Sequence, residues 1–158
     1  MKVDLIKGIL MKDFQKTFDM IFIDKEFGFK ADDKLISMVL ASLEYEHIYD
    51  DGRDSLVPHG LISRGITFIQ KGHIVVSYKS MKDPLINLKS GSYFGEISYI
   101  FKLVNQYSYK SLSKEDDTLL FSLKDENLRE IIEIYTEFSS IISLRAYRRF
   151  HYLTKLRR

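Results

Sequence analysis

The sequence predicts an α+β fold in which helices flank an antiparallel, jelly-roll-like β-roll. Short β-rich runs separated by turn residues fill the middle of the chain, where six of the eight glycines lie between Gly52 and Gly95. Helical periodicity precedes and follows this region. A glycine-bracketed segment interrupts the roll, and the apolar run after it is too short for a full helix. With 158 residues, the chain suits one domain with a core of reasonable size.

The first part of the chain contains two amphipathic segments. In the first, Ile6, Leu10, Phe14 and Phe18 recur at helical spacing. After a break at Gly28, an aspartate stands where an N-cap belongs, and a second apolar stripe follows it. The N-cap is Asp32, and the stripe consists of Leu35, Met38, Val39 and Leu43. We therefore assign residues 1–44 to a helical linker segment.

Seven short runs predict the strands of the roll, which we place at residues 45–124. They are residues 46–49, 55–57, 66–70, 73–78, 85–88, 107–112 and 118–123. Asp50 to Gly52 and Gln70 to Gly72 are typical of hairpin turns. Many short strands with frequent turns indicate a barrel, a sandwich or a roll.

Two helices are expected to close the chain over residues 125–158. Asp125 is placed as the cap of the first, whose apolar face is Leu128, Ile131, Ile132 and Tyr135. The second runs from about Phe138, with an apolar stripe of Phe138, Ile142, Ala146, Leu153 and Leu156. Arg149 completes this stripe, where a charge is costly unless it is paired. Its guanidinium is expected to meet a ligand, to extend to water or to pair with a buried carboxylate.

The segment from Gly91 to Ser98 carries the chemistry of a binding site. It has the sequence Gly-Ser-Tyr-Phe-Gly-Glu-Ile-Ser and follows a predicted strand. A strand that breaks at glycine and opens into one helical turn exposes backbone N–H groups to an anion. Gly95 is expected to let the backbone approach a bound group, and Glu96 to accept a hydrogen bond from a hydroxyl. An anion together with a hydroxyl is the chemistry of a nucleotide sugar.

This segment resembles the phosphate-binding cassette of cyclic-nucleotide-binding domains, in the version found in cyclic-nucleotide-gated and hyperpolarisation-activated channels. The resemblance implies a cAMP or cGMP ligand and no metal. It places Glu96 on the ribose 2′-hydroxyl and the amides of Gly95, Glu96, Ile97 and Ser98 around the cyclic phosphate. It also implies that Arg149 clamps the ligand and that the base is walled by Val76, Ile86 and Leu88.

One feature of the family's pattern is missing. Its cassettes end with an arginine, followed by Ser or Thr, on the strand after the short helix. Tyr107 or Ser108 occupies that position, and Ser108 offers only a neutral hydrogen bond. A hydrogen bond to a charged group contributes about 1.5–3 kcal/mol. Its loss weakens binding by roughly ten- to a hundredfold, so the sequence supports the fold more strongly than tight binding.

Composition excludes several function classes. The chain is 45% apolar and 29% charged, which is typical of a soluble globular protein, and its net charge of +2 does not indicate a nucleic-acid partner. It has no cysteine, so disulfides and thiolate metal sites are excluded. The histidines are scattered, and neither a nucleophile elbow nor a phosphate-binding P-loop is present. We therefore expect a chain that is not an enzyme, without a membrane span or a signal peptide of its own.

The resemblance implies a regulatory domain that couples cyclic-nucleotide binding to gating. Its expected place is the cytoplasmic side of a membrane channel or transporter, with a homotetramer assembled through the N-terminal linker. One alternative is a homologous domain that no longer binds nucleotide and acts as an interaction or oligomerisation module. Another is the regulatory domain of a sperm-type sodium/proton exchanger or of a kinase. The sequence leaves open the choice of parent and the choice between cAMP and cGMP.

Overall fold

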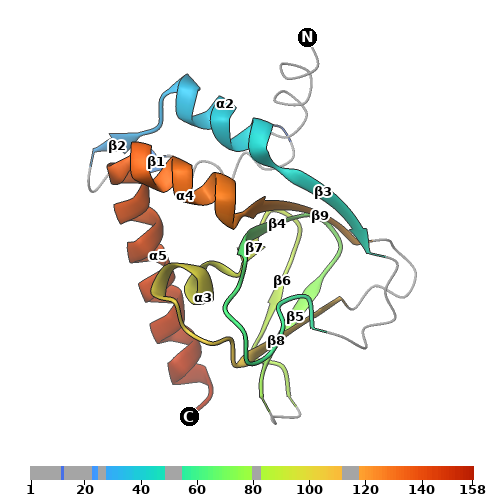
Figure 1. The fold of residues 1–158 in the computed structure, drawn as a ribbon. Helices are drawn as coiled ribbons and strands as arrows, with labels where there is room; N and C mark the ends of the chain where they lie inside the picture. The colour runs from blue at the N-terminus through green and yellow to red at the C-terminus, as the bar shows by residue number, and fades with distance from the viewer. Residues whose placement is uncertain (1–11, 13–22, 25–27, 49–54, 80–82, 112–117) are drawn as a thin grey trace.

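The structure, a computed structural model, describes residues 12, 23–24, 28–48, 55–79, 83–111 and 118–158. Two short strands, β1 (Ile23–Asp24) and β2 (Phe29–Lys30), precede helix α2 (Asp33–Ser42). The chain then enters the roll, whose strands lie beside the longer helices in Figure 1. The first predicted helix, around Ile6 to Phe18, falls almost entirely outside the described residues.

Two antiparallel sheets form the roll. The first has the strand order β3-β9-β4-β7, built from β3 (Glu44–Ile48), β9 (Thr118–Lys124), β4 (Gly65–Lys71) and β7 (Tyr93–Phe94). The second has the order β6-β5-β8, built from β6 (Ile86–Leu88), β5 (Ile74–Tyr78) and β8 (Tyr107–Ser111). Every described strand pair is antiparallel. The predicted α+β fold with an antiparallel roll is therefore confirmed.

Helices connect and cover these sheets. The short helix α3 (Glu96–Phe101) follows β7 directly, and α4 (Asp125–Ile134) follows β9. The long helix α5 (Thr136–Leu156) runs down one side of the molecule in Figure 1 and contacts both α3 and α4. Within the described segments, no helix is both long and apolar enough to cross a membrane. Helix α5 therefore connects α4 with α3, the short helix that begins within the predicted site.

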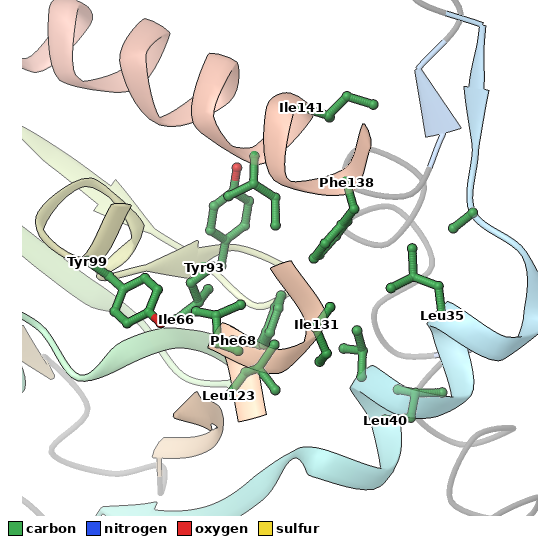
Figure 2. Packing of buried hydrophobic residues seen from close by; sticks show 14 of the residues in the cluster. Leu35, Leu40, Ile66, Phe68, Tyr93, Tyr99, Leu123, Ile131, Phe138 and Ile141 are labelled. Carbon is green, nitrogen blue, oxygen red and sulfur yellow. The ribbon is translucent and has the colours of Figure 1, made fainter. Parts of the chain in front are cut away.

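The core consists of two apolar clusters. The first lies where α2, α4 and the start of α5 meet the four-stranded sheet, and Figure 2 shows Leu35, Phe68 and Phe138 in it. The second fills the roll itself, with Ile69, Phe94 and other fully buried side chains. Burying one large apolar side chain stabilises the fold by about 1.5–3 kcal/mol. The second cluster thus fixes β7, and with it the start of α3.

The predicted N-cap is correct for helix α2 and wrong for helix α4. Asp32 caps α2 as predicted, since its Oδ1 accepts a hydrogen bond from the Leu35 N–H at 2.8 Å. Asp125 does not cap α4, because the helix begins one residue earlier than the prediction placed it. Lys124 is still paired in β9, so the helix begins at Asp125 itself. The carboxylate instead accepts a hydrogen bond from the Tyr99 hydroxyl of α3 at 2.8 Å.

The predicted strand at residues 55–57 is absent, and this segment forms a bend. The Ser55 hydroxyl donates to the carbonyl oxygen of Val57 at 2.7 Å and accepts from the Tyr109 N–H at 3.0 Å. These bonds turn the chain after a single backbone contact with β8. The predicted turn at Gln70 to Gly72 does separate β4 from β5, whereas the turn at Asp50 to Gly52 lies outside the described residues.

We expect the substitution Tyr99→Phe to lower the free energy of unfolding by about 1 kcal/mol at pH 7, since it removes the hydrogen bond between α3 and α4. The figure stays near that of an ordinary hydrogen bond because the side chain of Asp125 is 42% exposed. The hydrogen bond from Tyr99, together with Arg129, holds the pKa of Asp125 below its ordinary value of 3.8.

This pKa gives the effect a pH dependence with a defined sign. A lowered folded-state pKa contributes stability above the unfolded-state value, and that stability is lost as the pH falls through the folded-state value. Urea unfolding at pH 7 and at pH 3 measures it. The difference between Tyr99→Phe and the unsubstituted chain should shrink at pH 3, and an equal difference at both pH values would contradict the assignment.

Candidate functional site

A glycine with a left-handed backbone opens the candidate site. Gly95 follows β7 with φ 90° and ψ −9°, and α3 begins at the next residue. A Cβ atom at Gly95 would lie 2.7 Å from the Gly65 carbonyl oxygen and 3.0 Å from the Ser63 hydroxyl. Glycine is thus required by backbone conformation and by the neighbouring loop. The predicted reason, approach of a bound group on the Cβ side, does not apply, because the chain itself fills that space.

The next residue, Glu96, points into the molecule and is 1% exposed. Its Oε1 accepts a hydrogen bond from Arg149 Nη1 at 2.9 Å, which makes a buried ion pair between α3 and α5. The same nitrogen donates to the Tyr93 carbonyl oxygen at 2.6 Å, and the guanidinium lies over the Tyr93 ring, 4.6 Å from its centre. Arg149 therefore meets the requirement set by its place on an apolar stripe: it pairs with a buried carboxylate.

The ion pair also explains the protonation of Arg149. Burial acts to lower its pKa, but the Glu96 carboxylate and the Tyr93 side chain outweigh burial and raise the pKa of Arg149 above its ordinary value. Arg149 is therefore charged throughout the physiological range. The pKa of Tyr93 is raised, chiefly by burial and then by the Glu96 charge. Arg149 is thus a cation on α5 that the cassette holds in a fixed position.

A cavity of about 220 Å³ lies beside this ion pair. Its wall combines the cassette, the loop that follows α3, strand β8 and the far end of α5. The described lining residues are Val57, Gly95, Ile97, Ser98, Leu103, Val104, Asn105, Gln106, Tyr107, Tyr109, Phe150 and Arg157. Three predicted cassette residues thus share one cavity with Tyr107, one of the two candidates for the position of the missing arginine.

The remaining predicted residues lie around this cavity without lining it. Glu96 and Arg149 pair next to it. The predicted base wall, Val76, Ile86 and Leu88, belongs to the apolar cluster inside the roll, with Ile86 only partly buried. Ser108 alternates with the buried Tyr107 on β8 and is half-buried. The cavity as it stands therefore gives no contact between a ligand and these four apolar or hydroxyl side chains.

The Ser98 side chain is fully used inside the protein. Its hydroxyl accepts a hydrogen bond from the Ser63 N–H at 2.8 Å and donates to the Leu103 carbonyl oxygen at 2.7 Å. It thereby ties α3 to the loops on both sides of the cavity. The side chain of Ser98 positions the wall, and only its backbone is left to meet a ligand.

Asn105 shapes the cavity, although no sequence motif selects it. Its Nδ2 donates to the carbonyl oxygens of Val57 and Tyr107 at 3.1 and 2.7 Å, and its Oδ1 accepts from the Tyr107 N–H at 3.1 Å. These bonds lock the 55–62 loop against the start of β8. A buried asparagine before a strand was the available signal, but burial is known only from the fold.

Tyr107 and Tyr109 line the cavity, and each packs against a second aromatic side chain. The rings of Phe94 and Tyr109 stack at 5.2 Å with an angle of 19°, and the edge of Tyr78 meets Tyr107 at 5.6 Å. Burial raises the pKa values of Tyr107 and Tyr109, so both are neutral phenols at physiological pH. Among the described residues, no group of three or more metal-ligating side chains is assembled. The site offers amides, phenols and cations.

Comparisons with known proteins agree with this architecture. No family model matches the chain. Over 107 residues it is 32% identical to potassium/sodium hyperpolarization-activated cyclic nucleotide-gated channel 2 of Mus musculus, and the match covers 66% of this chain and 11% of the channel. Channel 4 of Oryctolagus cuniculus matches with the same identity and length, over 8% of that channel. The chain thus corresponds to a small part of these relatives.

The solved structure of PKAR CBD2 with bound Sp-2Cl-cAMPS shares the fold. It has a TM-score of 0.73 and 13% sequence identity, and the match covers 98% of this chain and 93% of that one. The helices and strands of that protein are arranged as in this chain. Sequence similarity to the channels, together with the shared fold, supports the identification of this chain as a cyclic-nucleotide-binding domain.

Proposed function

We propose that this chain is a regulatory domain that binds cAMP or cGMP and couples binding to the gating of a membrane channel or transporter. The observation that carries the proposal is the cavity that the cassette shares with α5, next to the buried pair of Glu96 and Arg149. The relatives in sequence are cyclic nucleotide-gated channels, and the neighbour in structure holds Sp-2Cl-cAMPS, a cAMP analogue. A role in regulation, without catalysis by this chain, fits both.

Each part of a cyclic nucleotide finds a counterpart near the cavity. Gly95, Ile97 and Ser98 present the backbone of the cassette to a phosphate. Arg149 occupies one carboxylate oxygen of Glu96, Oε1, and a carboxylate has further acceptor sites for a ribose hydroxyl. Tyr107, Tyr109 and Phe150 supply aromatic surface for a base.

Binding in this cavity requires a movement of α5. The cavity measures about 220 Å³, whereas sites for ligands of this size class measure about 300–1,000 Å³. Phe150, Arg149 and Arg157 all belong to the α5 side of the site, so α5 is the wall that has to shift. A ligand that favours one position of α5 shifts the population of helix positions, and α5 is in contact with α4 and α3. Helix α5 thus transmits the effect of ligand binding from the site to the rest of the domain.

A second candidate function is an interaction module that does not bind nucleotide. Two observations favour it. The carboxylate of Glu96 is already paired with the chain's own Arg149. Strand β8 carries Tyr107 and Ser108 at the two positions where the family's arginine was expected. In that case the ion pair has a purely structural role. A place on the cytoplasmic side of a membrane protein, and a homotetramer formed through residues 1–44, are compatible with either candidate and belong to the same proposal.

Titration calorimetry of the chain with cAMP and with cGMP separates the two candidates. We expect heat of binding and a rise in melting temperature with at least one ligand, because the cavity and cassette are both present. The substitution Glu96→Gln should weaken binding by about tenfold or more, since it removes the charge that a ribose hydroxyl would meet. Neither heat nor a thermal shift at millimolar ligand would leave the interaction module as the better account.

We expect Arg149→Ala to lower the free energy of unfolding by about 3 kcal/mol, because it leaves Glu96 buried without its partner. Lys155→Ala, which removes an exposed cation from the same helix, is the matched control and should change stability by less than about 0.5 kcal/mol. Denaturant unfolding measures both. A double variant, Glu96→Gln with Arg149→Met, should regain part of the loss; equal effects of Arg149→Ala and Lys155→Ala would show that the ion pair contributes nothing.

A further inference from the structure

A single charged side chain faces the cavity. Of the described residues that line it, Arg157 alone carries a formal charge, and the remainder are apolar, aromatic or neutral polar. A cation among uncharged walls attracts an anion more strongly than the same cation does in open water. The end of α5, whose backbone carbonyls favour cations, is a suitable place for it. The cavity is therefore selective for a negatively charged group.

The environment of Arg157 leaves its hydrogen-bond donors available. Its guanidinium carbon lies 4.5 Å from the centre of the Tyr78 ring, and Tyr78 packs with its edge against Tyr107. The Tyr78 hydroxyl donates to Gln106 Oε1 at 3.1 Å, which fixes the ring that supports the guanidinium. Within the part of the chain that the structure describes, no carboxylate pairs with Arg157. Arg149, eight residues earlier, is by contrast held by Glu96.

An unsatisfied donor lies beside this cation. The Tyr107 hydroxyl is buried and has no hydrogen-bond partner among the described residues, although Tyr107 is only 5% exposed. Burial raises the pKa of Tyr107, whereas the charge of Arg157 and the nearby side chains of Thr154 and Arg157 act to lower it. Buried polar groups in native proteins nearly always find a partner. A phenol O–H and a guanidinium at one cavity wall together require an acceptor with several oxygen atoms.

We propose that Arg157 and the Tyr107 hydroxyl bind the phosphate of the nucleotide, so that the end of α5 supplies the guanidinium that β8 lacks. This inference rests on the proposed function and names the residues that hold its ligand's charge. The guanidinium donates to one phosphate oxygen while the phenol donates to another, which satisfies the orphaned hydroxyl. Since the cation sits at the end of α5, binding the phosphate also holds that end of the helix in place.

Titration calorimetry on the whole chain tests the proposal with cAMP and with adenosine, which lacks the phosphate. Arg157→Gln should weaken cAMP binding by about ten- to a hundredfold and leave adenosine binding unchanged. Arg158→Gln removes the same charge from the exposed neighbouring residue and should change cAMP affinity by less than about twofold. Arg157→Lys keeps the charge without the planar fork and should give an intermediate affinity.

A second variant separates binding from packing. Tyr107→Phe fills the same space and removes a hydroxyl that has no partner in the free chain, so its melting temperature should be unchanged or higher. Its cAMP affinity should nevertheless fall by about two- to tenfold, through loss of one neutral hydrogen bond to the phosphate. A purely structural tyrosine would not show that combination.

The outcomes are distinguishable. If the unsubstituted chain binds cAMP and Arg157→Gln binds it as Arg158→Gln does, the phosphate assignment is overturned while the proposed function stands. If the unsubstituted chain binds neither cAMP nor cGMP at millimolar concentration, the proposed function fails and the assignment fails with it. If Arg157→Gln lowers affinity for adenosine as much as for cAMP, the arginine acts on the base or the helix and the phosphate assignment is again wrong.

Discussion

A carboxylate and a guanidinium buried between α3 and α5 determine how this domain is put together. Two charges removed from water are costly separately, so Glu96 and Arg149 stabilise the fold only while they stay in contact. The contact joins the cassette to a helix more than fifty residues later in the chain. The additional bond from Arg149 to the Tyr93 carbonyl oxygen, and its stacking on the Tyr93 ring, hold α5 against the start of the cassette in this arrangement. The position of α5 is therefore coupled energetically to the segment that carries the site.

That coupling gives physical content to a regulatory role. A change in the cassette that alters the Glu96 carboxylate acts directly on Arg149, and Arg149 belongs to a helix that also contacts α4. The Tyr99 hydroxyl, on the same short helix, bonds to the first residue of α4. Helix α3 thus makes polar contacts with both closing helices. These two contacts are enough to couple α3 to both closing helices if the helices switch between two arrangements.

Much of this arrangement could be predicted from residue patterns, because local rules fix it. Alternating burial on β8, the N-cap at Asp32 and the glycine before α3 all follow from the geometry of single elements. The unusual place of Arg149 on an apolar stripe predicted a need for compensation, and pairing with a carboxylate was one of the stated alternatives. The pattern did not decide between a ligand, water and a buried carboxylate. That choice depends on which side chain the tertiary fold places next to Arg149.

The residues that sequence reasoning missed share this dependence. Asn105 resembles any loop asparagine until the fold places three of its hydrogen bonds between two loops. Arg157 is one of several cations near the end of the chain, and only the cavity distinguishes it from its neighbours. Gly95 shows the converse: the motif identified a required glycine, but its backbone conformation and the nearby Gly65 carbonyl account for the requirement without a ligand.

A phosphate-binding cation at a helix end, as we propose for Arg157, would act differently from one on a strand. A cation on β8 is held by the ladder hydrogen bonds of its sheet, so its contact with a ligand would add affinity without moving any element. A cation at the end of α5 contributes only when that end lies over the cavity, so part of the binding free energy is spent on positioning the helix. Affinity is then lower than for a strand-borne arginine, because the ordering of α5 opposes it. In exchange, binding of the ligand's phosphate is coupled to the position of α5, and such coupling is what a regulatory domain needs.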